Sequence, residues 1–402
     1  MKRAFKFLAV FLTAAIAVYI MVVGLNYSAF KTLFQNAEGM AEGSEYVENT
    51  YSLKDLTRFI AEKPVYVYVM SYNVNQPDSG IFYQVDIPHT LGFMGSIFLV
   101  AEYERQVADG ILDPGEVVNK DEIQQYALPQ IYQNAHNGAM EVLTADDGTF
   151  TLDEAVSAML EYQSLPVFDY LWFRLGEDNI RTMMADFELE HTEMPVPFSG
   201  LYLVISPILP NGGDQSGDAA QHFESLGQFS RDQLQQMVID RASDQNLLNR
   251  SKEIIEKDRL GLTFMEERTA LNFFPQTTAR ELTSVMEIIY KDELISEEVS
   301  KAIKEKMRWS FDSEPIQRSF SDYGAIYDNR MGLLSGFDFG TSIYDGHTSI
   351  QAVFFDKLPI AFWHHMSANH MQEDYQQRLI WDPALYETTL NMINNESTKT
   401  GN

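Results

Sequence analysis

The chain has 402 residues, with 58 acidic against 29 basic side chains and a formal net charge of −29. This balance argues against nucleic acid and an anionic membrane surface as partners, and is typical of a soluble, salt-tolerant surface. Without cysteine there are no disulfides, thiolate nucleophiles or Cys-ligated zinc, while 45% hydrophobic residues can fill the core of one large domain or two.

The N-terminus predicts a membrane anchor over residues 1–25. Lys2, Arg3 and Lys6 precede Phe7 to Leu25, nineteen residues without a charge. At about 1.5 Å of rise per residue, this run matches a hydrocarbon core of about 30 Å. No clear A-x-A site follows, so we favour an uncleaved signal anchor over a cleaved signal peptide. The basic flank predicts a single pass in the inner (plasma) membrane, with the bulk of the chain periplasmic or extracytoplasmic.

After this anchor, residues 26–50 are predicted to form a polar tether, and a folded domain is expected over residues 51–395. Leu53 to Lys63 has the spacing of an amphipathic helix. Val65 to Tyr72 and Gly80 to Ile87 are rich in β-branched and aromatic residues and are separated by a turn. The domain therefore begins with a helix and two strands.

Helical periodicity dominates the middle of the chain. Apolar residues recur at helical spacing from Ser96 to Ala108, and Asp109-Gly110 ends that helix. Further helices are predicted at Thr151 to Tyr162, Pro166 to Leu175, Asp178 to Phe187, Thr277 to Tyr290 and Ser296 to Trp309. Ser296 is the expected N-cap of the last of these. Pro207 to Ala220 is predicted to be an irregular loop, and the helical lobe spans about residues 112–310.

The C-terminal part returns to strand patterns. Strands are predicted at Met331 to Phe339, His347 to Phe355 and Leu358 to His365, and a final helix at Asp374 to Asn394. Strands from both ends of the chain that enclose a mostly helical middle indicate an α+β fold.

Three local patterns carry a resemblance to a known family. The helix from Ser96 to Gly110 is followed by ILDPGEV at Ile111 to Val117, similar to a G-x-L-x-L-D-x-x-V pattern. Thr151 to Gly176 is similar to the helices that flank an S-D-N motif, and Thr277 to Ser296 to a T-T-P-x-D-M…L-L-S pair. On these patterns the chain resembles the class A β-lactamases and penicillin-binding proteins, a serine hydrolase superfamily, over about Val65 to Met366. The resemblance implies a β-lactamase/transpeptidase-like fold, an antiparallel sheet of N- and C-terminal strands with a helical lobe.

The nucleophile motif of that family is missing. Its members acylate a Ser with help from a Lys one helical turn later, in S-x-x-K. Alignment on the helix end places Phe93 and Ser96 at these two positions. A shift by one residue places Gly92 and Gly95 there instead. Neither register contains a lysine, so the resemblance implies a catalytically degenerate member.

The other two motifs have also changed. Gln163, Ser164 and Leu165 stand where the resemblance places S-D-N, and only Ser164 keeps a hydroxyl. The strand motif K-T-G corresponds to Asp338-Phe339-Gly340-Thr341, so a carboxylate replaces the lysine that holds a substrate carboxylate in the family. A ligand is therefore expected to be neutral or cationic at that end. The pocket candidates are Ser96, Ser164, Asp338, Phe339, Gly340 and Thr341.

Other catalytic patterns carry less weight. G-x-S-x-G, H-E-x-x-H and the P-loop motif do not occur. His364, His365 and His370 form the densest histidine group, but adjacent strand residues point to opposite faces, so we expect no metal site and no cofactor. His89 is either a base toward Ser96 or an ordinary strand-end histidine.

Together these observations predict a membrane-anchored, exported pseudoenzyme with a binding or scaffolding role in the cell envelope. Its expected partners are the inner membrane, through the N-terminal helix, and an envelope protein or cell-wall-derived ligand. The alternative is an active serine hydrolase, β-lactamase or peptidase-like, that uses displaced residues.

Overall fold

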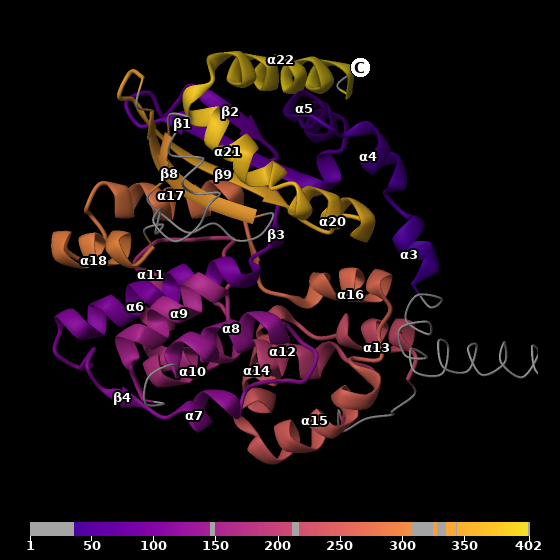
Figure 1. Cartoon of the computed structure of the whole chain (residues 1–402), viewed down its shortest axis with the longest axis vertical. Coiled ribbons are helices and arrows are strands. Elements are labelled where there is room, and N and C mark those ends of the chain that lie inside the picture. Colours follow the sequence, from indigo (N-terminus) through magenta and orange to yellow (C-terminus); the bar gives the residue numbers. More distant parts are fainter. Residues whose placement is uncertain are drawn as a thin grey trace, which may run out of the picture.

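The first and last long strands of the chain lie side by side in the middle of one antiparallel sheet (Figure 1). A computed structural model gives the structure of residues 36–144, 149–210, 217–307, 325–327, 335–342 and 344–400. The sheet has the order β2-β1-β9-β8-β7. Its strands are β1 (Val67–Asn73), β2 (Gly80–Tyr83), β7 (Ala325–Tyr327), β8 (Ser335–Ser342) and β9 (Thr348–Phe355). The expected α+β layout with an antiparallel sheet is confirmed.

Helices from both ends of the chain cover one face of this sheet, and α17 with α18 lies on the other (Figure 1). The elements of this sheet lobe are α3 (Ala37–Ala41), α4 (Ser44–Asn49), α5 (Leu53–Glu62), η2 (Pro64–Tyr66), α17 (Ala279–Tyr290), α18 (Glu297–Met307), α20 (Ile360–Ala368), α21 (Met371–Trp381) and α22 (Pro383–Thr400).

The rest of the chain forms a helical lobe on the side of α17. Its elements are η3 (Gly92–Gly95), α6 (Ser96–Ala108), α7 (Lys120–Gln124), α8 (Gln133–Leu143), α9 (Leu152–Tyr162), α10 (Leu165–Leu175), α11 (Glu177–Ala185), α12 (Phe198–Ile205), α13 (Ala219–Leu226), α14 (Arg231–Ser243), α15 (Gln245–Asp258), α16 (Phe264–Ala270) and η4 (Leu271–Phe273). Two short strand pairs, β3 (His89–Thr90) with β6 (Gln276–Thr277) and β4 (Val117–Val118) with β5 (Phe150–Thr151), connect its loops.

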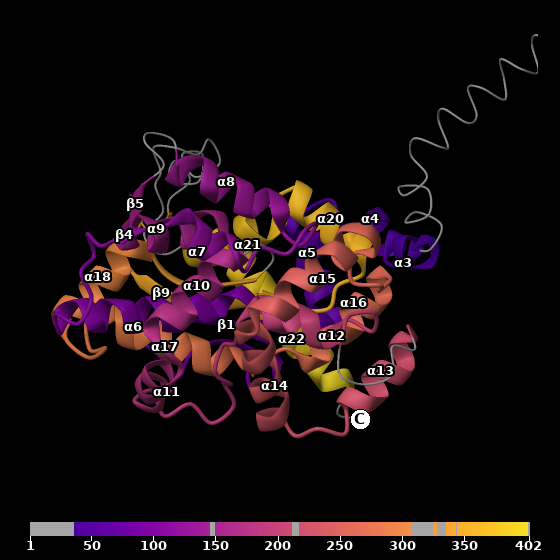
Figure 2. The same cartoon turned by 90° about the horizontal axis from the view of Figure 1, so that it is seen from below.

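The central strands contribute side chains to two hydrophobic cores, because successive side chains of a strand point to opposite faces of the sheet. Tyr68 and Met70 of β1 belong to the core shared with α17 and the helical lobe. Val67 and Val69 belong to a second core under α5, α20, α21 and α22. The two lobes also join through α18, which packs on both α6 and α17 (Figure 1, Figure 2).

Several predicted elements are confirmed. The helix predicted over Ser96 to Ala108 is α6, with the same bounds. Thr151 is the N-cap of α9, where it makes a capping box with Glu154. Ser296 caps α18, since its Oγ accepts a hydrogen bond from the Val299 amide at 3.1 Å.

Three predicted elements differ from the structure. Leu358 to His365 is not a strand, because α20 covers this run and buries Phe362 and Met366, four residues apart on one helix face. The single helix expected from Asp374 to Asn394 is divided into α21 and α22 at Asp382-Pro383. Residues 37–49 of the expected tether form α3 and α4, which pack against α20 and belong to the folded domain.

The predicted anchor, residues 1–25, lies outside the described residues. Within the described part of the chain, no helix combines the length and apolar character needed to cross a bilayer.

Candidate functional site

A cleft lies between the two lobes where the end of β9 meets the start of the helical lobe. Its inner part has a volume of about 220 Å³ and is lined by residues of β3, η3, α12, η4 and α20. Its outer part, of about 510 Å³, continues past α16 and α3. Tyr132, Tyr202, Phe274 and Trp363 line both parts, so the two adjoin. We call this site the interlobe cleft.

The predicted nucleophile positions are at the N-terminal end of α6. Gly92 and Phe93 belong to η3 and line the inner part of the cleft. The Phe93 ring packs near Phe168 and Phe198, with centroid distances of 5.9 and 6.5 Å. Ser96 is the first residue of α6 and is buried. The residues of η3 that line the cleft, Gly92, Phe93 and Met94, carry no nucleophilic group.

The three residues at the expected S-D-N position fall into two environments. Gln163 and Leu165 line the inner part of the cleft. Ser164 between them is the N-cap residue of α10 and is fully buried. The structure thus brings Gln163 and Leu165 to the same cleft as Gly92 and Phe93, whereas Ser164 is buried within the protein.

Ser164 ends a buried chain of hydrogen bonds that the sequence did not reveal. His136 Nδ1 lies 3.1 Å from Ser164 Oγ, and His136 Nε2 lies 3.0 Å from Gln124 Oε1. Because the amide oxygen only accepts, Nε2 carries the proton and Nδ1 accepts from the serine hydroxyl. Burial lowers the pKa of His136 to about 4, so its imidazole is neutral at pH 7. This is the geometry of a base beside a serine, and it also joins α7, α8 and α10.

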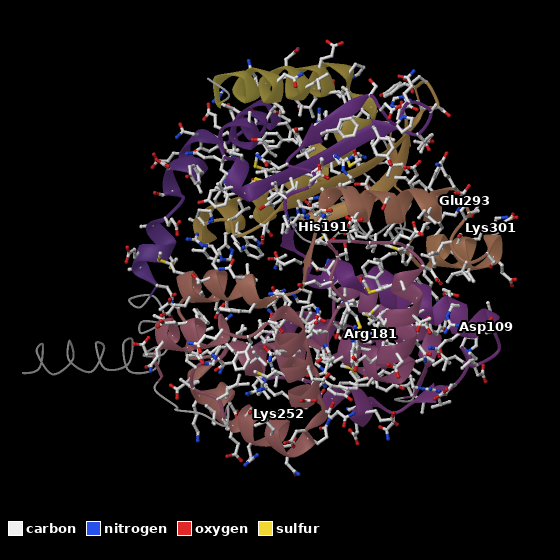
Figure 3. All side chains as sticks on the ribbon, turned by 180° about the vertical axis from the view of Figure 1, so that it is seen from behind. Asp109, Arg181, His191, Lys252, Glu293 and Lys301 are labelled. Carbon is white, nitrogen blue, oxygen red and sulfur yellow. The ribbon has the colours of Figure 1, made fainter. Side chains whose placement is uncertain are left out.

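A second hollow, of about 290 Å³, lies beside His136 on the outer side of the helical lobe. Gln124, Pro166, Lys252 and Glu256 contribute to its wall. Figure 3 shows Lys252 on the side of this lobe that faces away from the sheet. Ser164 itself has no exposed surface and does not line this hollow.

Asp338 lies on the sheet face opposite the helical lobe, which corrects the prediction that it faces a pocket. It pairs with Gln351 of β9, whose side chain donates to the Gln376 carbonyl of α21 at 2.8 Å. Residues directly opposite each other share a face, so the fully buried Asp338 lies under α21. Phe339 points the other way and packs against Tyr290 of α17, at 5.0 Å between ring centroids.

The next two positions of that predicted motif also lie within the sheet. Gly340 pairs with Ser349 of β9 and with Tyr327 of β7. Thr341 Oγ1 lies 2.9 Å from Thr348 Oγ1. Among the described residues that line the interlobe cleft, none belongs to Asp338 through Thr341.

The carboxylate that does line the cleft is Asp356, directly after β9. Its Oδ2 accepts hydrogen bonds from the Thr90 amide and from Thr90 Oγ1, each at 3.3 Å. The Lys357 ammonium lies 3.8 Å from the same oxygen. Asp356 is 7% exposed and lines both parts of the cleft, so its charge faces the interlobe space.

His89 lines the inner part beside Asp356, and neither of its ring nitrogens makes a hydrogen bond to Ser96. Its ring stacks on Tyr68 at 4.7 Å, and Nδ1 donates to the Thr90 carbonyl at 3.2 Å. Burial lowers its pKa to about 4, although Asp356 pulls in the opposite direction, so the ring is neutral at pH 7. Its Nε2 is a buried acceptor without a hydrogen-bond partner among the described residues.

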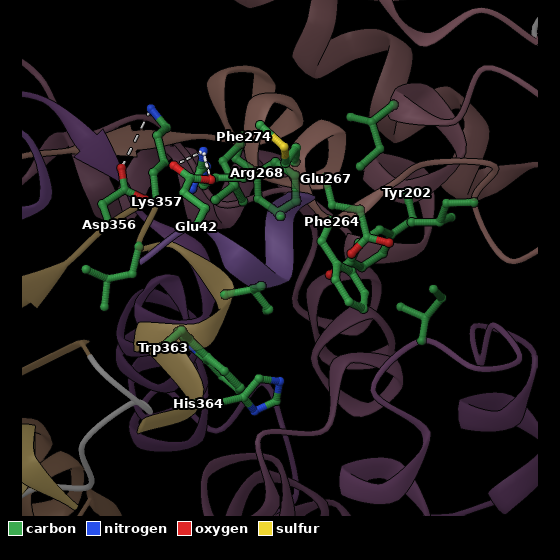
Figure 4. A pocket seen from close by; sticks show the side chains of 18 of the residues that line it. Glu42, Tyr202, Phe264, Glu267, Arg268, Phe274, Asp356, Lys357, Trp363 and His364 are labelled. Atoms are coloured by element: carbon green, nitrogen blue, oxygen red, sulfur yellow. Dashed lines mark hydrogen bonds and ion pairs between the residues drawn. The ribbon is translucent and has the colours of Figure 1, made fainter. Parts of the chain in front are cut away.

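Aromatic side chains and paired charges make the outer part of the cleft (Figure 4). Trp363, Tyr202 and Phe264 provide large apolar surfaces. Arg268 is paired with Glu42 at 2.8 Å, which connects the helical lobe to the N-terminal segment.

The remaining histidines do not converge. His365 Nε2 bonds to the Thr50 carbonyl at 2.6 Å, and His370 is the N-cap residue of α21. No three His, Asp or Glu side chains in the described ranges are grouped so that they could hold a metal ion.

Solved structures that resemble this chain include β-lactamases and a penicillin-binding protein. A β-lactamase from Sphaerobacter thermophilus DSM 20745 has 13% identity and a TM-score of 0.47, covering 82% of this chain and 96% of its own. The TLA-1 extended-spectrum β-lactamase has 9% identity and a TM-score of 0.47, with coverage of 86% and 99%. A mutant of PBP-A, solved as an acyl-enzyme complex with penicillin G, has 12% identity and a TM-score of 0.43, with coverage of 87% and 97%. No family model and no curated protein sequence matches.

Proposed function

We propose that this chain is a membrane-anchored, exported binding protein of the cell envelope whose interlobe cleft holds a ligand without forming a covalent bond to it. The observation that carries the proposal is Phe93 in the cleft at the N-terminal end of α6. Covalent catalysis needs a nucleophile beside a base. In the register that aligns Phe93 with the family's serine, an apolar ring lines the cleft where that register places the nucleophile.

The composition of the cleft supports binding as its role. The walls of its inner part are mostly apolar and aromatic, and the polar side chains His89 and Asp356 both bond to Thr90 there. Ligand sites are commonly apolar clefts with a small number of placed polar groups. Ser96 and Ser164, the hydroxyls nearest the altered motifs, are both buried.

Covalent labelling tests the proposal directly. The full-length protein in lipid nanodiscs is incubated with benzylpenicillin and, separately, with a fluorophosphonate probe, and its intact mass is measured. We expect no adduct with either reagent. An adduct that disappears in Ser96→Ala would overturn the binding proposal and would place the nucleophile on α6.

A second candidate function is a serine hydrolase, which the hydrogen bond between Ser164 and His136 favours. In this case Ser164 would be the displaced nucleophile and His136 its base, oriented by Gln124. A fluorophosphonate adduct that is lost in Ser164→Ala and kept in Ser96→Ala would support the hydrolase. An unlabelled wild-type protein would contradict it.

A further inference from the structure

The inner part of the interlobe cleft offers hydrogen-bond acceptors at a place where its walls are aromatic. His89 Nε2 is buried and unpartnered among the described residues, and its tautomer is fixed because Nδ1 donates to Thr90. The Asp356 carboxylate lies on the other side of Thr90, whose amide and hydroxyl it accepts. A neutral imidazole nitrogen and a carboxylate oxygen can both accept a hydrogen bond from a ligand.

The charge of the inner part is negative. Asp356 is the one Asp, Glu, Lys or Arg among the described residues that line it. Lys357 lines the outer part, and its ammonium donates to Asn272 Oδ1 at 2.8 Å while remaining 3.8 Å from Asp356. The carboxylate is therefore only partly compensated, and an anionic group entering the inner part would be repelled.

Aromatic rings surround these acceptors. Phe274, Phe355 and Trp363 line the inner part, together with Tyr202 from α12. The faces of such rings attract a cation, and the attraction is strongest where water is excluded. Figure 4 shows Asp356, Phe274 and Trp363 around the same space.

We infer that the inner part of the interlobe cleft binds the protonated amine of a ligand whose apolar or aromatic body extends into the outer part. The inference rests on the proposed binding function and names the chemical class of its ligand. The ammonium donates to Asp356 and His89, and the aromatic walls hold the carbon skeleton. In this inference the carboxylate that favours a cationic end is Asp356, whereas the sequence had suggested Asp338.

Three probes of similar skeleton and different charge test the inference: phenethylammonium, 2-phenylethanol and 3-phenylpropanoate. Their binding to the full-length protein in nanodiscs is measured by saturation-transfer NMR and calorimetry. We expect the ammonium to bind about tenfold more tightly than the alcohol, and the carboxylate not to bind.

Two substitutions act in opposite directions. Asp356→Asn keeps an acceptor for Thr90 but removes the charge, so the ammonium should bind only as tightly as the alcohol. Lys357→Gln removes a competing cation and should strengthen ammonium binding, a gain that a loss of folding cannot produce. The control is Asp109→Asn, which removes an exposed carboxylate at the end of α6. This variant should bind all three probes as tightly as the wild type.

The outcomes separate this inference from the function on which it rests. If the ammonium and the alcohol bind equally tightly, and Asp356→Asn does not change their affinity, the amine assignment is overturned. If this binding is lost in Trp363→Ala, the cleft is still a binding site. Failure of all three probes to bind would overturn both. Charge-dependent binding would support the amine site even if the covalent probes were to reveal a nucleophile.

Discussion

The buried histidine that joins α7, α8 and α10 gives the fold a pH-dependent stability that one substitution removes. Burial lowers the pKa of His136 to about 4 from an ordinary value of 6.5. At pH values between these two pKa values, His136 is protonated in the unfolded chain but not in the folded protein. The free energy of unfolding therefore decreases as the pH falls through this range. At about 1.36 kcal/mol for each tenfold change in proton affinity, this contribution amounts to roughly 3 kcal/mol.

Urea unfolding followed by circular dichroism, at several pH values from neutral to about 4.5, measures this contribution. His136→Gln should be less stable than the wild type at neutral pH, because the hydrogen bonds to Ser164 and Gln124 change. The difference should shrink as the pH is lowered. His89, whose pKa is also about 4, remains in both proteins and so cancels in the comparison.

The matched control is His364→Gln, since His364 is exposed on α20. The free energy of unfolding of this variant should equal that of the wild type at every pH. A difference between wild type and His136→Gln that stays constant from neutral to acidic pH would refute the reasoning, because it would mean that His136 titrates alike in the folded and unfolded chains.

Three further predictions concern the anchor and two helix contacts. The protein should remain with membranes after a high-salt wash, with its C-terminal domain open to protease from the outer side, because apolar burial does not respond to ionic screening; recovery of a soluble form that begins near Asn26 would show a cleaved signal instead. Thr151→Ala should lower the free energy of unfolding by about 1 kcal/mol through loss of the α9 capping box, and Thr151→Ser should restore it; equal stability of the two variants would argue against the cap. Trp172→Phe should cost about 1–3 kcal/mol, since the buried Pro195 carbonyl loses the indole donor at 2.8 Å, and chemical denaturation that shows no loss would contradict this.

Local patterns predicted those elements whose boundaries are set within a few residues. Both ends of α6 were predicted because its apolar spacing and the following Asp109-Gly110 are local signals. The strand predicted at Leu358 to His365 was wrong because a short apolar run has no period that distinguishes a buried helix from a buried strand. The structure decides in favour of α20, since this segment leaves the sheet directly after Asp356.

The direction of the Asp338 side chain was also mispredicted. Its strand was expected at Met331 to Phe339, and the structure has it as β8 (Ser335–Ser342). The face on which Asp338 lies is fixed by its pairing with Gln351. Side-chain direction depends on register, which composition alone does not determine.

The candidate site was predictable only in part. The resemblance pointed to the segments around residues 92–96 and 163–165, and Gly92, Phe93, Gln163 and Leu165 line one cleft, whereas the pocket candidates Ser96 and Ser164 are buried. The roles of His136 and Asp356 depend on contacts made far along the chain, to Ser164 and to Thr90. No motif spans these separations, so no sequence signal pointed to them.

The pairing of β1 with β9 has a consequence for how the protein is made. Ser71 and Gln351, neighbours in the sheet, are separated by 280 positions in the chain. A growing polypeptide therefore cannot complete its sheet until nearly all of it has been synthesised, and until then β1 has an open edge toward its missing neighbour. A nascent chain that stops before Thr348 lacks β9, and its exposed Val67 and Val69 would direct it to aggregation or proteolysis rather than to a shortened but folded product.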